Sequence, residues 1–152
     1  MIWIYCYELT PSTYKQLEEN LSGADNVILK NKGVGSKNET IYIQDNEFDA
    51  GNSIARKGNC PMELIALDDD IEEPVTCIKM DIEGVEKDAL EGARGHIINE
   101  KPKLLICAYH IPEDIFDIPK MITDMRGDYK LYLRYDGKSG GIWPCDYVIY
   151  AL

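Results

Sequence analysis

Three strand-like runs of this sequence end in side chains that can exchange protons. Asp81 and Glu83 follow one apolar run, Glu8 ends another and His110 ends a third. In open α/β sheets, ligands bind outside the carboxyl ends of the strands, so we expect these side chains to meet at one rim. An imidazole or a carboxylate placed there is a suitable general base for removing a proton from a hydroxyl group.

Each of these residues also has a simpler explanation. Asp81, Glu83 and Glu86 precede or begin an expected helix, where an acid gains about 0.3–1 kcal/mol from the helix dipole. Capping explains one such acid better than three, and three crowded carboxylates suit a general base, a metal ligand or a cation-binding site. Glu8 suits the two hydroxyls of a ribose or is simply solvated. His110 is a general base or is held by backbone hydrogen bonds.

The elements that position these groups alternate between strands and helices. Apolar periodicity predicts strands at 2–8, 26–30, 39–44, 62–67, 76–82, 102–110, 129–135 and 147–152, and helices at 10–21, 85–99 and 112–127. We expect the run 2–8 to be buried on both faces. The alternation predicts a doubly wound α/β fold, a mostly parallel sheet with helices on both faces, ended by an antiparallel pair.

Three further segments have no strong periodicity. Residues 31–35 form a loop whose glycines allow close approach of a ligand, and 45–61 is a surface excursion that could cover the site. The loop at 136–144 lies between the last two strands. The acidic run 68–70 is interpreted as a solvated turn rather than a cation site, because three consecutive side chains cannot point the same way.

The composition limits the classes of partner. The chain has 152 residues and a formal net charge of −11, so we expect one domain, 1–152, that binds neither nucleic acid nor an anionic membrane. No apolar run reaches the ~20 residues of a membrane span and no leader is recognised, which predicts a soluble cytoplasmic protein. The cysteines are scattered, without disulfide or zinc spacing, and Cys6, Cys77 and Cys107 are expected to be buried.

One longer motif contains most of these residues. The string Ile-Lys-Met-Asp-Ile-Glu-Gly-Val-Glu at 78–86 is followed by Leu-Glu-Gly-Ala at 90–93. With the Tyr-Glu pair at 7–8 and the Tyr-His pair at 109–110, it resembles the FkbM-type family of S-adenosylmethionine-dependent O-methyltransferases. The resemblance extends over nearly the whole chain.

The resemblance implies a Rossmann-like class I methyltransferase fold and a function. Glu8 would hold the ribose of S-adenosylmethionine, and the loop with Asn31 and Gly33 would lie near the adenine. Asp81 would face the methionine end of the cofactor and the acceptor, a hydroxyl of a small molecule or sugar. Glu83 and His110 would complete the catalytic group, with no metal ion.

One departure from the family pattern has structural consequences. Such methyltransferases place a first strand and a glycine-rich loop ahead of the Glu8 strand, whereas this sequence begins at that strand. The absent strand would lie between the Glu8 strand and the Asp81 strand, which leaves two unpaired edges. Either these strands pair directly, or a partner chain such as a second copy pairs with them, or the natural polypeptide is longer. We expect weak cofactor binding by this chain and a homodimer.

Two other functions fit the same residues. The first is a non-catalytic binding or assembly module that has kept the fold. The second is a metal-dependent hydrolase that uses Asp81, Glu83, Glu86 and His110, since oxygen-rich clusters suit magnesium or manganese.

Overall fold

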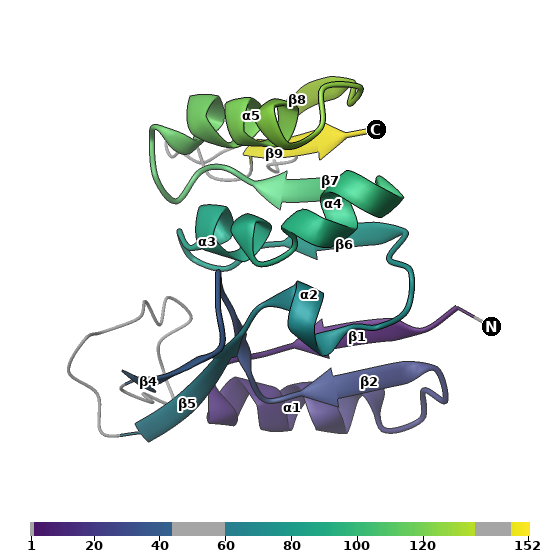
Figure 1. Cartoon of the computed structure of the whole chain (residues 1–152). Helices are drawn as coiled ribbons and strands as arrows, with labels where there is room; N and C mark the ends of the chain where they lie inside the picture. The colour runs from purple at the N-terminus through teal and green to yellow at the C-terminus, as the bar shows by residue number, and fades with distance from the viewer. Residues whose placement is uncertain (1, 44–59, 136–146) are drawn as a thin grey trace.

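The described strands form three sheets, with helices on both sides of the molecule (Figure 1). The computed structural model describes residues 2–43, 60–135 and 147–152. The elements are β1 (Ile4–Tyr7), α1 (Pro11–Leu21), β2 (Val27–Lys30), β3 (Gly33–Val34), β4 (Glu39–Ile43), β5 (Cys60–Ile65), α2 (Leu67–Asp70), β6 (Cys77–Met80), α3 (Glu86–Glu91), α4 (Arg94–Glu100), β7 (Lys103–Cys107), α5 (Asp114–Met125), β8 (Leu131–Tyr135) and β9 (Tyr147–Ala151). The excursion predicted at 45–61 and the loop at 136–144 lie almost entirely outside the described residues.

The predicted mixed α/β class is confirmed. β1 pairs with β2 in parallel, and a four-stranded sheet has the order β6-β7-β9-β8. Within it β6 and β7 are parallel, whereas β9 runs antiparallel to both of its neighbours, as predicted for the end of the chain. The separate sheet β3-β5-β4 was not expected, because its strand β3 lies in the segment that we interpreted as a loop.

A break separates the β1-β2 pair from the four-stranded sheet. β1 lies between β2 and β6 in Figure 1, yet among the described residues β1 pairs only with β2 and β6 only with β7. Of the three alternatives predicted for the unpaired edges, the structure contradicts one, the direct pairing of the Glu8 strand with the Asp81 strand. An edge of β1 and an edge of β6 present backbone groups that no described strand pairs.

The first strand is less buried than predicted. Ile2, Trp3 and Ile4 are 78%, 50% and 48% exposed, and the rest of β1 is half-buried. The prediction of burial on both faces was wrong, because it rested on the apolar composition of the run alone. With β2 as its only described strand partner, β1 keeps an open edge.

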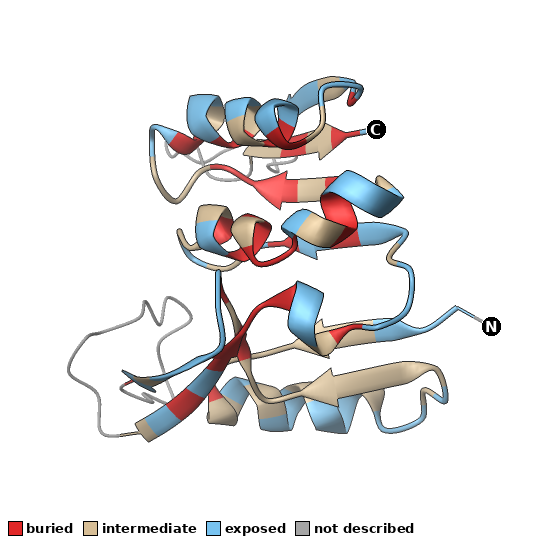
Figure 2. Ribbon diagram, viewed as in Figure 1, coloured by how far each residue is buried: buried red, intermediate tan, exposed pale blue. Residues whose placement is uncertain are grey.

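The core lies between the four-stranded sheet and the helices α3, α4 and α5. Figure 2 shows buried residues concentrated on these elements. The strands contribute Ile78, Met80, Leu104, Ile106, Ile149 and Ala151, and the helices contribute Leu90, Ile97, Ile118 and Ile122. Burying one large aliphatic side chain stabilises the fold by roughly 1.5–3 kcal/mol, so this layer holds the sheet rigid beneath the site. None of the described helices is long and apolar enough to cross a membrane.

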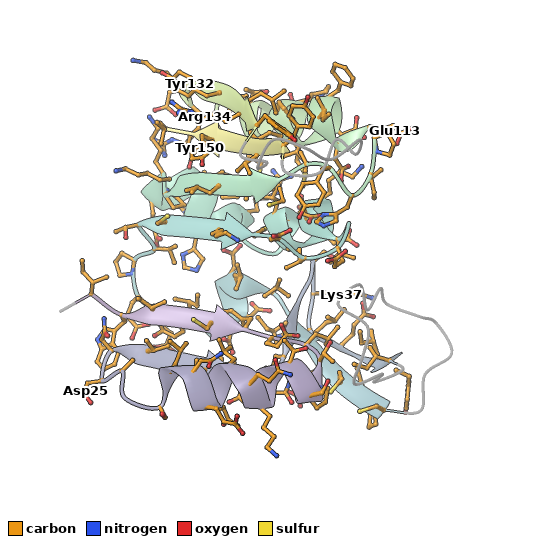
Figure 3. The ribbon with its side chains drawn as sticks, turned by 180° about the vertical axis from the view of Figure 1, so that it is seen from behind. Asp25, Lys37, Glu113, Tyr132, Arg134 and Tyr150 are labelled. Carbon is orange, nitrogen blue, oxygen red and sulfur yellow. The ribbon has the colours of Figure 1, made fainter. Side chains whose placement is uncertain are left out.

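No described helix packs on the opposite face of the four-stranded sheet. The strand register aligns Lys79, Leu105, Tyr150 and Tyr132 in one row on this face. Figure 3 shows Tyr132, Arg134 and Tyr150 close together on the side away from α3, α4 and α5. Helices do lie on both sides of the molecule, because α1 is on the far side in Figure 1, but the described helices cover this sheet on one face only.

The helix predicted at 85–99 is divided into α3 and α4 at Gly92. A Cβ atom on Gly92 would lie 2.0 Å from the carbonyl oxygen of Gly35 and 3.1 Å from the Cα of Ala66. The backbone carbonyl of Gly92 also accepts a hydrogen bond of 2.8 Å from the N–H of Asp68. These contacts with distant segments bend the chain at a point where the apolar period continues.

The acidic run 68–70 holds neighbouring elements together instead of forming a solvated turn. The Asp68 carboxylate accepts hydrogen bonds from the backbone N–H groups of Gly95 and His96 in the first turn of α4. The Asp70 carboxylate accepts hydrogen bonds from Lys30 on β2 and Tyr7 on β1. The helix α2 therefore joins the β1-β2 pair to the helices that cover the four-stranded sheet.

Candidate active site

The turn between β6 and α3 carries the acidic motif in a strained backbone conformation. Glu83 has a φ of 59° and Gly84 a φ of 95°. The left-handed region costs a non-glycine residue about 1–3 kcal/mol, and such strain is concentrated at functional sites. The side chains of Asp81 and Glu83 remain 40% and 47% exposed, so both carboxylates are accessible to a ligand.

The segment after β7 brings an aromatic pair to this turn. The Tyr109 hydroxyl donates a hydrogen bond of 2.8 Å to Asp81 Oδ1, and the rings of Tyr109 and His110 lie 4.2 Å apart. Burial raises the pKa of the Tyr109 hydroxyl, and the hydrogen bond to Asp81 raises it further. Tyr109 is therefore a protonated donor that orients the Asp81 carboxylate.

His110 lies among three carboxylates. Its Nε2 is 3.5 Å from Asp81 Oδ1 and 3.5 Å from Glu83 Oε2, and its Nδ1 is 2.9 Å from Glu86 Oε1. The imidazole is only 10% exposed, and neither ring nitrogen has an aligned hydrogen bond within the described residues. The three residues predicted as catalytic, Asp81, Glu83 and His110, are thus brought together, although their roles stay predictions.

Two residues of this group, Glu86 and Tyr109, were not among the predicted catalytic residues. Glu86 is fully buried, and its Oε1 accepts a hydrogen bond of 3.1 Å from the Ile82 N–H. Its position in the sequence contained a signal, because Glu86 shares a helical face with the buried Ala89 and Leu90. A carboxylate on an apolar helix face needs a buried partner.

Of the two cysteines near the site, one is buried as predicted and the other is exposed. Burial raises the pKa of the Cys107 thiol to about 12, and the charge of nearby Asp81 adds to this effect. Cys107 is buried, as expected, and its raised pKa makes it a poor nucleophile. Cys77 was expected to be buried but is exposed, because it points to the face of β6 that the described helices do not cover.

The residues predicted to bind the cofactor, Glu8, Asn31 and Gly33, follow β1 and β2. Glu8 Oε1 accepts a hydrogen bond of 2.8 Å from the backbone N–H of Thr10. The Asn31 amide donates hydrogen bonds of 2.7 Å and 3.1 Å to the carbonyl oxygens of Glu8 and Leu9. These contacts fix the loop after β1 and leave Glu8 half-buried with its carboxylate at the strand end.

Gly33 has a packing role in this structure. A Cβ atom on Gly33 would lie 2.4 Å from Leu64 Cδ2 and 3.0 Å from Leu9 Cδ1. The absent side chain thus allows β3 to approach the side chains around β5. A contact between Gly33 and the cofactor remains a prediction.

The two groups of residues share one rim of the molecule. β1, β2, β6 and β7 point in the same direction in Figure 1, so Glu8, Asn31, Asp81 and Tyr109 all follow strand ends on that side. Within the described residues, no group of three or more His, Cys, Asp or Glu side chains is arranged to hold a metal ion. The metal-dependent hydrolase and the proton-removing role of the His110 group both stay predictions.

Comparisons with known proteins agree on one family. The family model of the methyltransferase FkbM domain matches residues 3–131. The crystal structure of methyltransferase FkbM from Methylobacillus flagellatus KT is similar to this chain, with a TM-score of 0.76 and 27% sequence identity. The match covers 99% of this chain and 36% of that protein, so this chain spans little more than a third of its length. A search of curated proteins found no match.

Proposed function

Because the chain belongs to the FkbM methyltransferase domain family, we propose that it transfers a methyl group from S-adenosylmethionine to a hydroxyl of a small molecule or sugar. The observation that carries this proposal is the nine-tenths buried imidazole of His110, whose Nε2 lies 3.5 Å from each of two accessible carboxylates. A hydroxyl group bound next to these side chains would be positioned to lose its proton as the methyl group arrives.

The residues at the rim have the chemistry that this cofactor requires. The Glu8 carboxylate can accept hydrogen bonds from both ribose hydroxyls, as carboxylates at this strand end do in other dinucleotide and nucleoside sites. Asp81 can accept a hydrogen bond from the ammonium group at the methionine end of the cofactor. The hydrogen bond from the Tyr109 hydroxyl to Asp81 Oδ1 keeps this carboxylate in place. When bound, S-adenosylmethionine supplies an electrophilic methyl group on a positively charged sulfur.

His110 is the proposed general base. Its Nε2 faces Asp81 and Glu83, and these carboxylates stabilise the imidazolium that forms when His110 takes the hydroxyl proton. Asp81, half-exposed and fixed by Tyr109, would orient the acceptor oxygen. Burial of the imidazole excludes water from the side that accepts the proton.

Titration calorimetry with S-adenosylmethionine tests the cofactor site. We expect weak binding, because no described strand pairs with the facing edges of β1 and β6. The Glu8→Gln variant should bind at least about tenfold more weakly, since one charged hydrogen-bonding group contributes roughly 1.5–3 kcal/mol. The matched variant Glu19→Gln, on the exposed side of α1, should bind as the unmodified chain does.

The outcomes separate the competing functions. Binding that needs Glu8 supports the methyltransferase. No binding at millimolar cofactor, or binding that Glu8→Gln leaves unchanged, contradicts the proposed site and favours a non-catalytic module. Micromolar affinity would contradict only the expectation that this chain binds weakly.

Transfer of a tritium-labelled methyl group to a panel of monosaccharides and small alcohols tests the base. We expect His110→Ala to lower the transfer rate by about 10²–10⁴-fold, the usual contribution of a general base. His96→Ala is the matched control, because His96 contacts Asp68 and Glu100 away from this site. Unchanged turnover in His110→Ala would remove His110 from the catalytic role.

A further inference from the structure

The contacts of Glu86 point to a role that the catalytic proposal does not include. We propose that Glu86 is a positioning residue, which holds the Nδ1 side of His110 so that Nε2 faces the acceptor. This inference rests on the proposed function for its catalytic meaning, but its structural content concerns only the two side chains. It assigns different tasks to the three carboxylates around His110.

Burial distinguishes Glu86 from the other two acids. Glu86 is 0% exposed, whereas the side chains of Asp81 and Glu83 are 40% and 47% exposed. A buried carboxylate is costly unless hydrogen bonds and an opposite charge compensate it. Asp81 and Glu83 can be compensated by water or by a ligand, but Glu86 depends on protein groups.

The protein groups that compensate Glu86 meet at one oxygen atom. Glu86 Oε1 accepts the hydrogen bond of Ile82 N–H at 3.1 Å and lies 2.9 Å from His110 Nδ1. In the described part of the chain, His110 is the only basic side chain within ion-pair distance of Glu86. The other carboxylate oxygen of Glu86, Oε2, is buried without a hydrogen bond. The buried carboxylate therefore holds the strained turn after β6 and the imidazole after β7 in one arrangement.

This arrangement determines which nitrogen faces the acceptor. A carboxylate close to one ring nitrogen attracts the imidazole proton to that nitrogen. Glu86 Oε1, at 2.9 Å from Nδ1, is closer to the ring than the two carboxylate oxygens at 3.5 Å from Nε2. Its negative charge therefore favours the neutral ring with the proton on Nδ1 and the lone pair on Nε2. Tyr109 packs against the same ring and restricts its rotation. A base with the opposite tautomer would present an N–H group to the hydroxyl and could not accept its proton.

The second histidine provides an internal reference. His96 Nδ1 lies 2.9 Å from Glu100 Oε2, and Nε2 lies 3.9 Å from Asp68 Oδ1. Both of these carboxylates also accept backbone hydrogen bonds, so their role is structural. With two histidines in the sequence, the imidazole signals of the two sites can be assigned by substitution.

Nitrogen-15 NMR of the imidazole rings tests the inference without cofactor or acceptor. In the unmodified chain above the titration range of histidine, we expect His110 to be predominantly the Nδ1–H tautomer. Glu86→Leu should cause loss of this form, whereas Glu86→Gln should retain it, because the amide oxygen can accept a hydrogen bond from the Nδ1–H group. Glu100→Leu is the matched control and should change the signals of His96 alone.

An Nε2–H tautomer of His110 in the unmodified chain would overturn the inference, and this outcome does not depend on whether any variant folds. An unchanged His110 tautomer in folded Glu86→Leu would also overturn it. Because no cofactor is added, a failure here is distinct from a failure of methyl transfer. Conversely, the expected tautomer would remain valid even if S-adenosylmethionine did not bind.

Discussion

Glu83 shows at the level of one residue how the site is held in place. Its left-handed backbone, with a φ of 59°, directs a carboxylate toward His110 at an energetic cost. Neither the cost nor the contact can be inferred from residue type, because glutamate has no preference for this region. The contact depends on where the segment after β7 places the imidazole.

Substitution of Glu83 measures this strain. Glu83→Gly and Glu83→Ala both remove the carboxylate, but only glycine adopts a φ of 59° without strain. We expect Glu83→Gly to be about 1 kcal/mol more stable than Glu83→Ala in urea unfolding. Equal stability of the two variants would show that the turn stores no strain at this position.

The contacts of Asp70 should make the free energy of unfolding depend on pH. Burial raises the pKa of this carboxyl, but the hydrogen bonds from Lys30 and Tyr7 outweigh that effect and lower it overall. A lowered pKa in the folded state means that the stabilisation is present above the ordinary carboxyl range and is lost as the pH falls through the folded-state pKa. Acid should therefore weaken the connection between α2 and the β1-β2 pair.

Urea unfolding at pH 7 and near pH 3 checks this expectation. The unmodified chain should lose more stability between the two pH values than Asp70→Asn, which has no ionisable group at that position. Asp25→Asn, a substitution at an exposed turn, is the control and should keep the pH dependence of the unmodified chain. An Asp70→Asn variant with the original pH dependence would contradict the argument.

At the scale of elements, the sequence predicted most strands and helices but not their junctions. Periodicity located β6, β7, α1 and α5 within a few residues of their bounds. It failed at Gly92, where the apolar pattern continues through two helices, because the break is caused by the Gly35 carbonyl from a distant segment. It also failed for β3, a two-residue strand that exists only through pairing with β5.

Gly92→Ala tests the junction between α3 and α4. The added Cβ would meet backbone atoms at 2.0 Å and 3.1 Å, which cannot move as a flexible side chain can. We expect a loss of about 1–3 kcal/mol or more in the free energy of unfolding, as for overpacked cores. Gly23→Ala is the matched control, because a Cβ there has no atom within 4 Å. Equal stability of the two variants would contradict this close packing.

At the scale of the whole molecule, the open edges of β1 and β6 are possible sites of association with a second chain. Unpaired strand edges bind other strands unless charge or cover prevents it, and we propose that two copies of this chain associate through them. The net charge of −11 opposes association, so added salt should strengthen it.

Sedimentation velocity at low and high salt tests this proposal. We expect a dimer that is favoured by salt and lost in Ile4→Lys, which places a charge on the exposed start of β1. Phe116→Lys, at a 77% exposed position of α5, should still dimerise. A strictly monomeric profile at every salt concentration would contradict the proposal.

The sequence alone determined the residue types of the site, the alternation of strands and helices, and the family, because these depend on local pattern and on the motif at 78–86. The tertiary structure decided what joins them. The burial of Glu86 against His110 and the break at Gly92 each arise from contacts between segments far apart in the chain. Local periodicity contains no information about such contacts, since the free energy that favours them exists only once the sheet and its helices have packed.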